Sequence, residues 1–185
     1  VYIIAEIGQA HDGSLGILFS YISEIAKTDV NAIKFQMHIP EAESSDFEPF
    51  RINFSLEDNS RFDYWKRTGF SFNQWEQIKN HCDKLNIEFL CSPFSLLAVD
   101  WLEKLKVKRY KIGSGEVSNH LLLRKIAQTR KPVILSSGLS NWDDLDSAFS
   151  VLKKYNSGEV SVLQCTTKYP TAPNDIGLNV INLLR

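Results

Sequence analysis

The sequence predicts an α/β fold, a TIM-type (β/α)8 barrel of which about six strand–helix units are present. Short apolar runs rich in β-branched residues alternate strictly with longer amphipathic stretches over 185 residues. Such alternation is typical of a parallel sheet covered by helices. Polar and ionisable residues follow nearly every apolar run, whereas a doubly wound sheet concentrates its site at one switch point. This spread of polar residues over many strand ends favours the barrel.

Six strands and five helices are expected, in alternation. The apolar runs predict strands at residues 1–8, 32–38, 88–94, 109–117 (with its loop), 132–139 and 160–169. Helical spacing of apolar residues predicts helices at residues 15–27, 72–85, 96–105, 121–129 and 141–155. Ser71 or Asn73 is expected to cap the second helix, and Asn141 the last.

Residues 40–69 are the one long stretch expected to be irregular. The stretch is acidic at first and then aromatic, with Phe47, Phe50, Phe54, Phe62, Tyr64 and Trp65. Because it follows the second strand, it starts on the active-site face of a barrel. Long loops are often functional, so two interpretations stay open: a lid over a substrate, or an aromatic pad on the side of the barrel.

The sequence also indicates how much of a complete barrel the chain contains. A complete barrel has eight units in about 250 residues. The chain holds six units, and Val1 already lies in a strand-like run. We therefore expect residues 1–185 to form one incomplete barrel domain that lacks strands seven and eight.

Composition excludes several functional classes. The chain is 43% hydrophobic and 23% charged with a formal net charge of −1, so no basic field favours nucleic acid or an anionic membrane. No apolar run is long enough to cross a bilayer. Three widely spaced cysteines argue against a disulfide framework or a cysteine zinc site. We expect a cytoplasmic protein without nucleic-acid or membrane partners.

Two lysines lie inside apolar strands, Lys34 in AIKFQ and Lys111 in RYKIG. A buried lysine is costly unless it meets an anion or loses its proton. If the two converge, they form a cationic pocket for a phosphate or carboxylate. A single strand-end lysine that reaches solvent is the plainer alternative, and a lysine that forms a Schiff base is another.

Small hydroxyl residues and glycines follow strands three to five. Ser92, Ser114 and Ser136 lie there, with Gly113, Gly115 and Gly138 close by in the sequence. Hydroxyl groups and exposed backbone N–H groups can approach phosphate oxygens closely. Each of these residues alone is an ordinary turn residue.

Two carboxylates occupy strand or strand-end positions, Glu6 and Glu116. A carboxylate inside an apolar strand needs a cation, a metal-bound water or a sugar hydroxyl as its partner. A salt bridge to a barrel lysine is compatible with a role in the site. His11 follows the first strand as a loop residue or a hydrogen-bonding residue of the site.

Six blocks of sequence follow one another along the chain: AEIGQAHDG, AIKFQMHIPE, FLCSPF, YKIGSGE, PVILSSG and QCTTKYP. In this order they resemble the sialic acid synthase family, which includes N-acetylneuraminate, legionaminate and pseudaminate synthases. The resemblance implies a barrel that condenses phosphoenolpyruvate with an N-acetylated hexosamine, such as N-acetylmannosamine, to give a sialic acid and phosphate. It also implies a divalent metal (Mn2+ or Mg2+), a C-terminal antifreeze-like domain and a homodimer.

The resemblance assigns roles to individual residues. Phosphoenolpyruvate-binding positions of the family match Lys34, Ser92, Lys111, Ser114 and Ser136. Positions that meet the acceptor sugar match Gln36, Glu116, Thr167 and Tyr169. Glu6 matches the acid beside the metal and the aldehyde, and we expect Glu6 and Glu116 to be catalytic.

The resemblance also has gaps. The family's two metal-binding histidines lie on strands seven and eight, so the metal ligands are expected beyond Arg185. Family members often have His where Gln164 stands, and the sialate enzymes can have Asn where Thr167 stands. The particular acceptor sugar therefore stays open.

Two other functions remain open. A Schiff-base pyruvate aldolase on the same barrel would use Lys111 or Lys34. A catalytically dead fragment would bind a sugar or phosphate without turnover.

Overall fold

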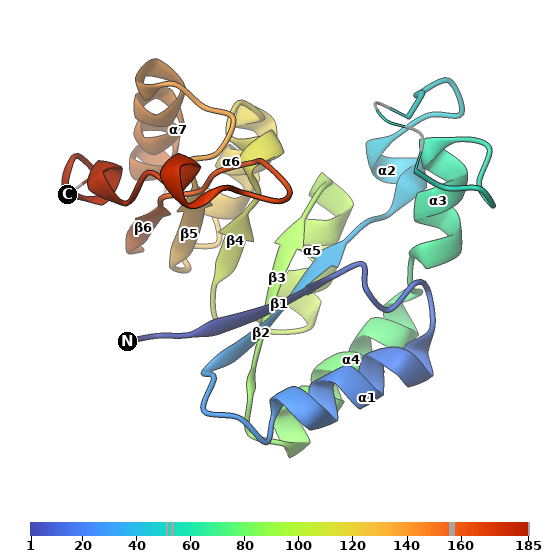
Figure 1. Ribbon diagram of the computed structural model, residues 1–185. Coiled ribbons are helices and arrows are strands. Elements are labelled where there is room, and N and C mark those ends of the chain that lie inside the picture. Colours follow the sequence, from blue (N-terminus) through green and yellow to red (C-terminus); the bar gives the residue numbers. More distant parts are fainter. Residues whose placement is uncertain (51, 53, 156–157, 185) are drawn as a thin grey trace. The chain divides into compact units, whose positions relative to one another are not determined.

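The computed structural model describes residues 1–50, 52, 54–155 and 158–184. The chain divides into two compact units, Val1–Val107 and Lys108–Arg185. In each unit three parallel strands follow one another in sequence order, and helices connect them (Figure 1). The alternation of strands and helices predicted from the sequence is confirmed.

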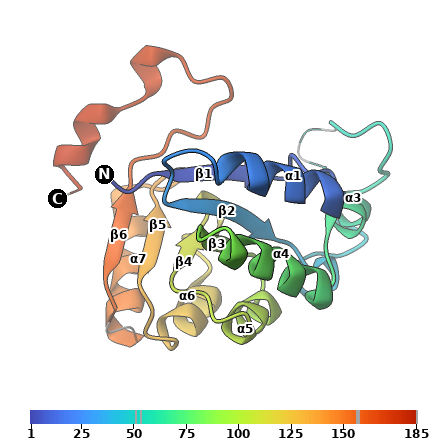
Figure 2. The same ribbon diagram turned by 90° about the horizontal axis from the view of Figure 1, so that it is seen from below.

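The first unit is built on strands β1 (Ile4–Gly8), β2 (Ala32–Met37) and β3 (Glu88–Pro93). Its long helices are α1 (Leu15–Ile25), α4 (Phe72–Lys84) and α5 (Leu96–Lys104). Helices α1 and α4 lie side by side (Figures 1 and 2). Ser71 caps α4 in a capping box with Gln74, which decides between the two predicted caps.

The two faces of the first unit's sheet differ in chemistry. Phe35 of β2 and Phe89 of β3 stack on each other, and both contact Trp75 of α4. These contacts mark the face covered by helices. Since side chains alternate along a strand, the opposite face takes the even-numbered residues of β2 and β3. That face holds Lys34, Gln36 and Ser92, and it corresponds to the interior of a barrel.

Residues 40–69 are less irregular than the sequence suggested. The stretch contains the short helix α2 (Pro40–Glu43) and the two-turn helix α3 (Arg61–Thr68). Ser60 caps α3, Asp63 lies in its first turn and Arg67 in its last, all of which are helix signals. The expectation of an irregular stretch was wrong because its aromatic composition concealed these signals.

The second unit contains strands β4 (Tyr110–Ile112), β5 (Val133–Ser136) and β6 (Val160–Leu163). Its helices are α6 (His120–Ala127) and α7 (Trp142–Tyr155), which pack against each other (Figure 2). Asn141 caps α7 as predicted, since its Oδ1 accepts from the Asp144 N–H at 2.9 Å. The described residues of this unit also include the short 3-10 helices η1 (Ser114–Glu116), η2 (Pro173–Asp175) and η3 (Leu178–Asn182).

The predicted strands are longer than the observed ones at their polar ends. The strand expected to reach residue 169 ends at Leu163. Beyond it, the side chains of Gln164 and Thr166 donate to the backbone carbonyl of Ile176. These residues therefore form a loop held by side chains.

No helix in the part of the chain that the structure describes has both the length and the apolarity needed to cross a bilayer.

Candidate active site

Two groups of predicted site residues lie at the carboxyl ends of strands, one in each unit. We call Glu6, Lys34, Gln36 and Ser92 the carboxylate–lysine cluster. Strand register places Glu6 beside Lys34 and Gln36 beside Ser92. We call Ser114, Ser136 and Gly138 the hydroxyl–glycine cluster. The prediction that Lys34 and Lys111 converge joins the two units and stays a prediction.

Glu6 and Lys34 form an ion pair in the first unit. Lys34 Nζ lies 2.7 Å from Glu6 Oε2, and the Lys34 side chain is 8% exposed whereas the Glu6 side chain is 50% exposed. The other oxygen, Glu6 Oε1, accepts from the Gly8 N–H at 2.9 Å. Gly8 adopts a left-handed φ of +56°, which glycine tolerates without strain. The buried ammonium therefore has a partner, and the carboxylate keeps a side open to solvent.

Ser92 brings a buried hydroxyl group to the same face. Ser92 is 1% exposed, and its Oγ has no hydrogen-bond partner among the described residues. Leaving a buried hydroxyl unpaired costs about 1–3 kcal/mol. Such a group is typical of a site that is completed by a ligand.

Gln36 extends the cluster toward the end of β2. Its side-chain Nε2 lies 3.9 Å from the position that a Cβ on Gly8 would take, and Glu6 Oε1 lies 3.7 Å from the same point. Its Oε1 lies 3.4 Å from Nε2 of His38. Gln36 therefore lies between the carboxylate of Glu6 and the ring of His38.

Lys111 holds a comparable place in the second unit. It is 9% exposed, and its Nζ donates to the carbonyl of Ile112 at 2.9 Å. Register pairs Lys111 with Ile134 of β5, so alternation puts Lys111 and Ser136 on one face.

The hydroxyl–glycine cluster depends on close packing. Ser114 Oγ and Ser136 Oγ are 2.8 Å apart. A Cβ on Gly138 would lie 2.6 Å from Ser114 Oγ and 2.8 Å from Thr167 Cγ2. Only glycine therefore fits at position 138 without displacing its neighbours.

The remaining predicted residues of the second unit are less enclosed. Glu116 Oε2 accepts from Asn119 Nδ2 at 2.9 Å. Thr167 is exposed although its methyl group packs against Gly138. Tyr169 is 93% exposed, so the described contacts of its unit do not bring it into the buried cluster.

His11 is a buried histidine of the first unit. Burial lowers the pKa of His11 from 6.5 to about 4. Its Nδ1 accepts from the Gly13 N–H at 3.1 Å, and its ring contacts Phe70. His11 is thus a neutral hydrogen-bonding residue of the loop after β1.

Sequence reasoning missed an ion network around Arg67. Its guanidinium bonds to Asp12 in the loop after β1, at 2.8 Å, and to both carboxylate oxygens of Asp58. The Arg67 guanidinium holds the pKa of Asp58 below its usual range. No local pattern signals a pair 55 residues apart, so only the fold reveals it.

The described residues do not by themselves form a metal centre. No group of three or more His, Cys, Asp or Glu side chains lies close enough to hold an ion in the described part of the chain. The half-exposed carboxylate of Glu6 could contribute one oxygen, but it already pairs with Lys34. We therefore assign no metal to these residues.

Comparison with known proteins identifies the family. Residues 21–185 match the NeuB family. The chain is 31% identical to the N,N'-diacetyllegionaminic acid synthase of Campylobacter jejuni over 99% of this chain and 56% of that protein. It is 30% identical to the N-acetylneuraminate-9-phosphate synthase of Drosophila melanogaster, over 100% of this chain and 50% of that protein.

A solved structure agrees along the whole chain. The N-acetylneuraminic acid synthetase of Leptospira borgpetersenii, in complex with citrate, aligns with a TM-score of 0.85 at 30% identity, over 100% of this chain and 60% of that chain. The predicted fold class, part of a TIM-type barrel, is confirmed. The chain spans about half the length of the curated relatives it matches. The chain therefore belongs to the NeuB family.

Proposed function

We propose that this chain carries the phosphoenolpyruvate-binding part of a synthase that condenses phosphoenolpyruvate with an N-acetylated hexosamine. The products are a nonulosonic (sialic) acid and inorganic phosphate. The relatives named as legionaminic acid and N-acetylneuraminate-9-phosphate synthases support this reaction class. The particular sugar is part of the proposal.

The observation that carries the proposal is the buried pair of donors on β2 and β3. Lys34 supplies a nearly buried ammonium group, and Ser92 supplies a hydroxyl group without a described partner. Together they suit an anionic ligand that accepts both hydrogen bonds. Phosphoenolpyruvate, with a phosphate and a carboxylate, has such acceptors.

The proposed reaction forms a carbon–carbon bond and a bond from carbon 2 to water oxygen, and it breaks the bond from carbon 2 to the phosphate oxygen. Carbon 3 of phosphoenolpyruvate attacks the aldehyde carbon of the sugar, whose oxygen takes up a proton. Water then adds to carbon 2 and gives up one proton, and the bond between carbon 2 and the phosphate oxygen breaks, so that carbon 2 becomes a keto group and phosphate leaves with the remaining proton of that water. Lys34 and Lys111 hold the two anionic groups, and Glu6 or Glu116 orients the water.

The hydroxyl–glycine cluster has a positioning role in this proposal. Ser114 and Ser136 are already 2.8 Å apart, so their hydroxyl groups need little rearrangement to donate to one anion. Preorganised donors of this kind lower the barrier because they do not reorient during the reaction. Gln36, Thr167 and Tyr169 are proposed to meet the acceptor sugar.

The remaining expectations belong to the complete protein. We propose a divalent metal, Mn2+ or Mg2+, which when bound acts as a Lewis acid, with ligands outside residues 1–185. Strands seven and eight, a C-terminal domain, a cytoplasmic location and a homodimer are parts of the same proposal. None of the roles given to the residues above depends on them.

Phosphate release tests the proposed function. The complete protein containing this chain is incubated with phosphoenolpyruvate, Mn2+ and N-acetylmannosamine or a related hexosamine, and phosphate is measured. Release that requires all three components supports the proposal. The absence of release with any N-acetylated hexosamine contradicts it and favours a sugar- or phosphate-binding role.

The Schiff-base aldolase is less well supported by the geometry. Lys34 Nζ is paired with the Glu6 carboxylate at 2.7 Å, so it would have to leave this ion pair to attack a carbonyl. Borohydride reduction in the presence of pyruvate distinguishes the two functions. An aldolase gains a stable adduct in its intact mass, and the proposed synthase gains none.

A further inference from the structure

His38, which follows β2, is held in an unusually complete set of contacts within the first unit. Its ring stacks on Trp65 of α3, with centroids 3.6 Å apart and planes 10° from parallel. On its other face it stacks on Phe94, at 4.1 Å and 17°. The side chain is 4% exposed. Two aromatic rings thus fix the plane of the imidazole.

The edges of the ring carry polar contacts that the stacking does not require. Nδ1 lies 2.6 Å from Oε1 of Glu43 in α2, whose carboxylate is itself nearly buried. The other Glu43 oxygen accepts from the Ile39 N–H at 3.4 Å. A carboxylate only accepts, so Nδ1 carries a proton and Glu43 orients the ring.

The second nitrogen of the ring faces the candidate site. Nε2 of His38 lies 3.4 Å from Oε1 of Gln36, at the long end of the hydrogen-bond range. The side-chain amide of Gln36 therefore lies between His38 and Gly8, with its Nε2 3.9 Å from the position that a Cβ on Gly8 would take. A phenylalanine would satisfy the stacking equally well, so the two polar contacts explain why the position holds a histidine.

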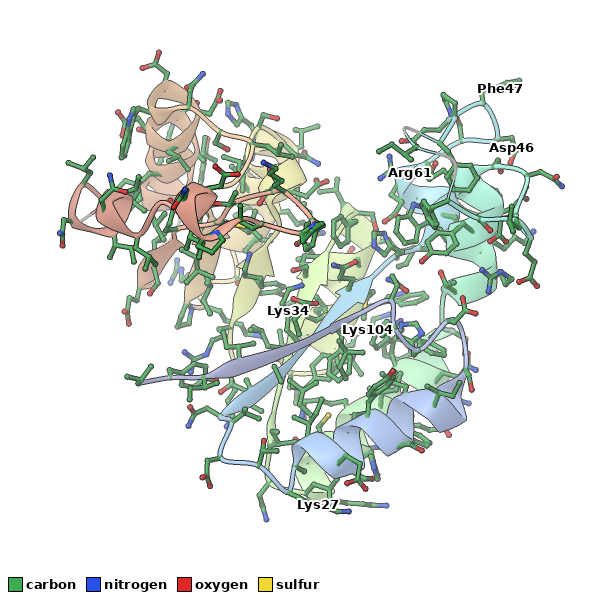
Figure 3. All side chains as sticks on the ribbon, viewed as in Figure 1. Lys27, Lys34, Asp46, Phe47, Arg61 and Lys104 are labelled. Atoms are coloured by element: carbon green, nitrogen blue, oxygen red, sulfur yellow. The ribbon has the colours of Figure 1, made fainter. Side chains whose placement is uncertain are left out.

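The aromatic side chains of residues 40–69 form a series of contacts that supports Trp65, the residue that stacks on His38. Trp65 contacts Tyr64, Tyr64 contacts Phe54, and Phe54 contacts Phe50. Asp46 and Phe47 lie at the outer tip of the segment, and Arg61 lies at the start of α3 (Figure 3). The packed part of the segment is thus an aromatic pad at the end of β2, and it contacts His38 through Trp65.

We propose that His38 is a positioning residue: clamped between Trp65 and Phe94 and oriented by Glu43, it fixes the side-chain amide of Gln36 for the acceptor sugar. This inference rests on the proposed function, in which Gln36 meets that sugar. His38 itself does not touch the reacting atoms. It acts through Gln36, so its effect depends on Gln36 being present.

A double-mutant cycle in the complete protein tests this dependence. His38→Phe keeps a flat ring between the two aromatic side chains and removes both polar edges. We expect it to raise KM for the acceptor sugar roughly tenfold and to leave KM for phosphoenolpyruvate unchanged. In a Gln36→Met background the same substitution should change neither KM, because its target is gone.

His81→Phe is the matched control. His81 also contacts an aromatic ring, Phe19, and a single polar group, Ser23 Oγ at 3.0 Å, on the α1–α4 side of the unit. It should alter neither KM. Glu43→Gln keeps the size of the side chain and should raise KM for the sugar less than His38→Phe does. An equal effect of His38→Phe on both substrates, or an effect that persists in the Gln36→Met background, overturns the inference.

A measurement without substrate separates this inference from the proposed function. In 15N-labelled protein the side-chain amide signals of Gln36 are assigned by their loss in Gln36→Met. They should shift in His38→Phe and stay in place in His81→Phe. If the wild-type protein releases no phosphate but the signals shift, the proposed function fails and the positioning role stands. Unmoved signals refute the positioning role, whatever the activity.

Discussion

The two strand-end clusters both place polar groups at the carboxyl ends of parallel strands, but they differ in chemistry. The carboxylate–lysine cluster places an ion pair of 2.7 Å on a barrel-type inner face. The hydroxyl–glycine cluster places two neutral hydroxyl groups 2.8 Å apart beside a glycine. Both lie where parallel strands end, which is where barrels build their sites. One cluster uses charge, and the other uses close approach.

The difference shows what each kind of group requires. A buried ammonium loses hydration, so it needs a partner of opposite charge, which Glu6 supplies from the neighbouring strand. A hydroxyl loses less on burial but must be brought within hydrogen-bond distance. Gly138 permits this because it has no side chain. Charge should therefore dominate activity in the first unit, and shape should dominate it in the second.

The largest expected effect comes from removing the charge of the first cluster. Lys34→Met keeps the volume of the side chain, and the half-exposed Glu6 stays hydrated, so the fold should persist. Phosphate release by the complete protein should fall about 100- to 1,000-fold, as when a preorganised donor is lost. Lys104→Met, which removes a surface lysine over Phe72, is the control and should retain activity. Near-normal activity of Lys34→Met would contradict the claim that charge dominates activity in the first unit.

The lowered pKa of His11 predicts that the stability of the fold depends on pH. The pKa of His11 is about 4 in the fold against 6.5 ordinarily, so between these values the unfolded chain binds a proton that the folded chain does not. Stability should therefore fall as pH drops from 6.5 to 4, by about 3 kcal/mol from this group. His11→Asn supplies another acceptor for the Gly13 N–H and should flatten that slope in denaturant unfolding. An unchanged slope would exclude His11 as its source.

Close packing in the hydroxyl–glycine cluster is tested at Gly138. Gly138→Ala places a methyl group against Ser114 and Thr167 and should separate the two hydroxyl groups. We expect a loss of about 1–3 kcal/mol in unfolding free energy together with a higher KM for phosphoenolpyruvate. Gly115→Ala is the matched control, because a Cβ there meets nothing within 4 Å. If both variants behave alike, close approach is not what position 138 provides.

The smallest expected effect is the loss of one hydroxyl group. Ser136→Ala removes the partner of Ser114 and should raise KM for phosphoenolpyruvate roughly fivefold, the worth of one hydrogen bond. Ser161→Ala, at an exposed position of β6, should leave KM unchanged. A loss as large as that of Lys34→Met would show that hydroxyl groups and charge matter equally, contrary to the comparison.

Sequence reasoning placed the chemistry at strand ends because the signals are local. A lysine or glutamate inside an apolar run is conspicuous, and Lys34 and Glu6 were found in this way. Ser114 and Ser136 were found as small residues at the ends of successive strands. Helix α3 was missed because its caps lie within an aromatic stretch. Tyr169 is 93% exposed, and its role toward the acceptor sugar stays a prediction.

The amino-acid sequence by itself determined the alternation of strands and helices, the strand-end positions of the site residues and the family resemblance. These properties depend on residues close together in the chain or on ordered motifs. Only the tertiary structure decided that Glu6 pairs with Lys34, that Arg67 joins Asp12 to Asp58, and that His38 lies between Trp65 and Phe94. Partners that lie many residues apart are chosen by strand register and packing, which no local pattern encodes.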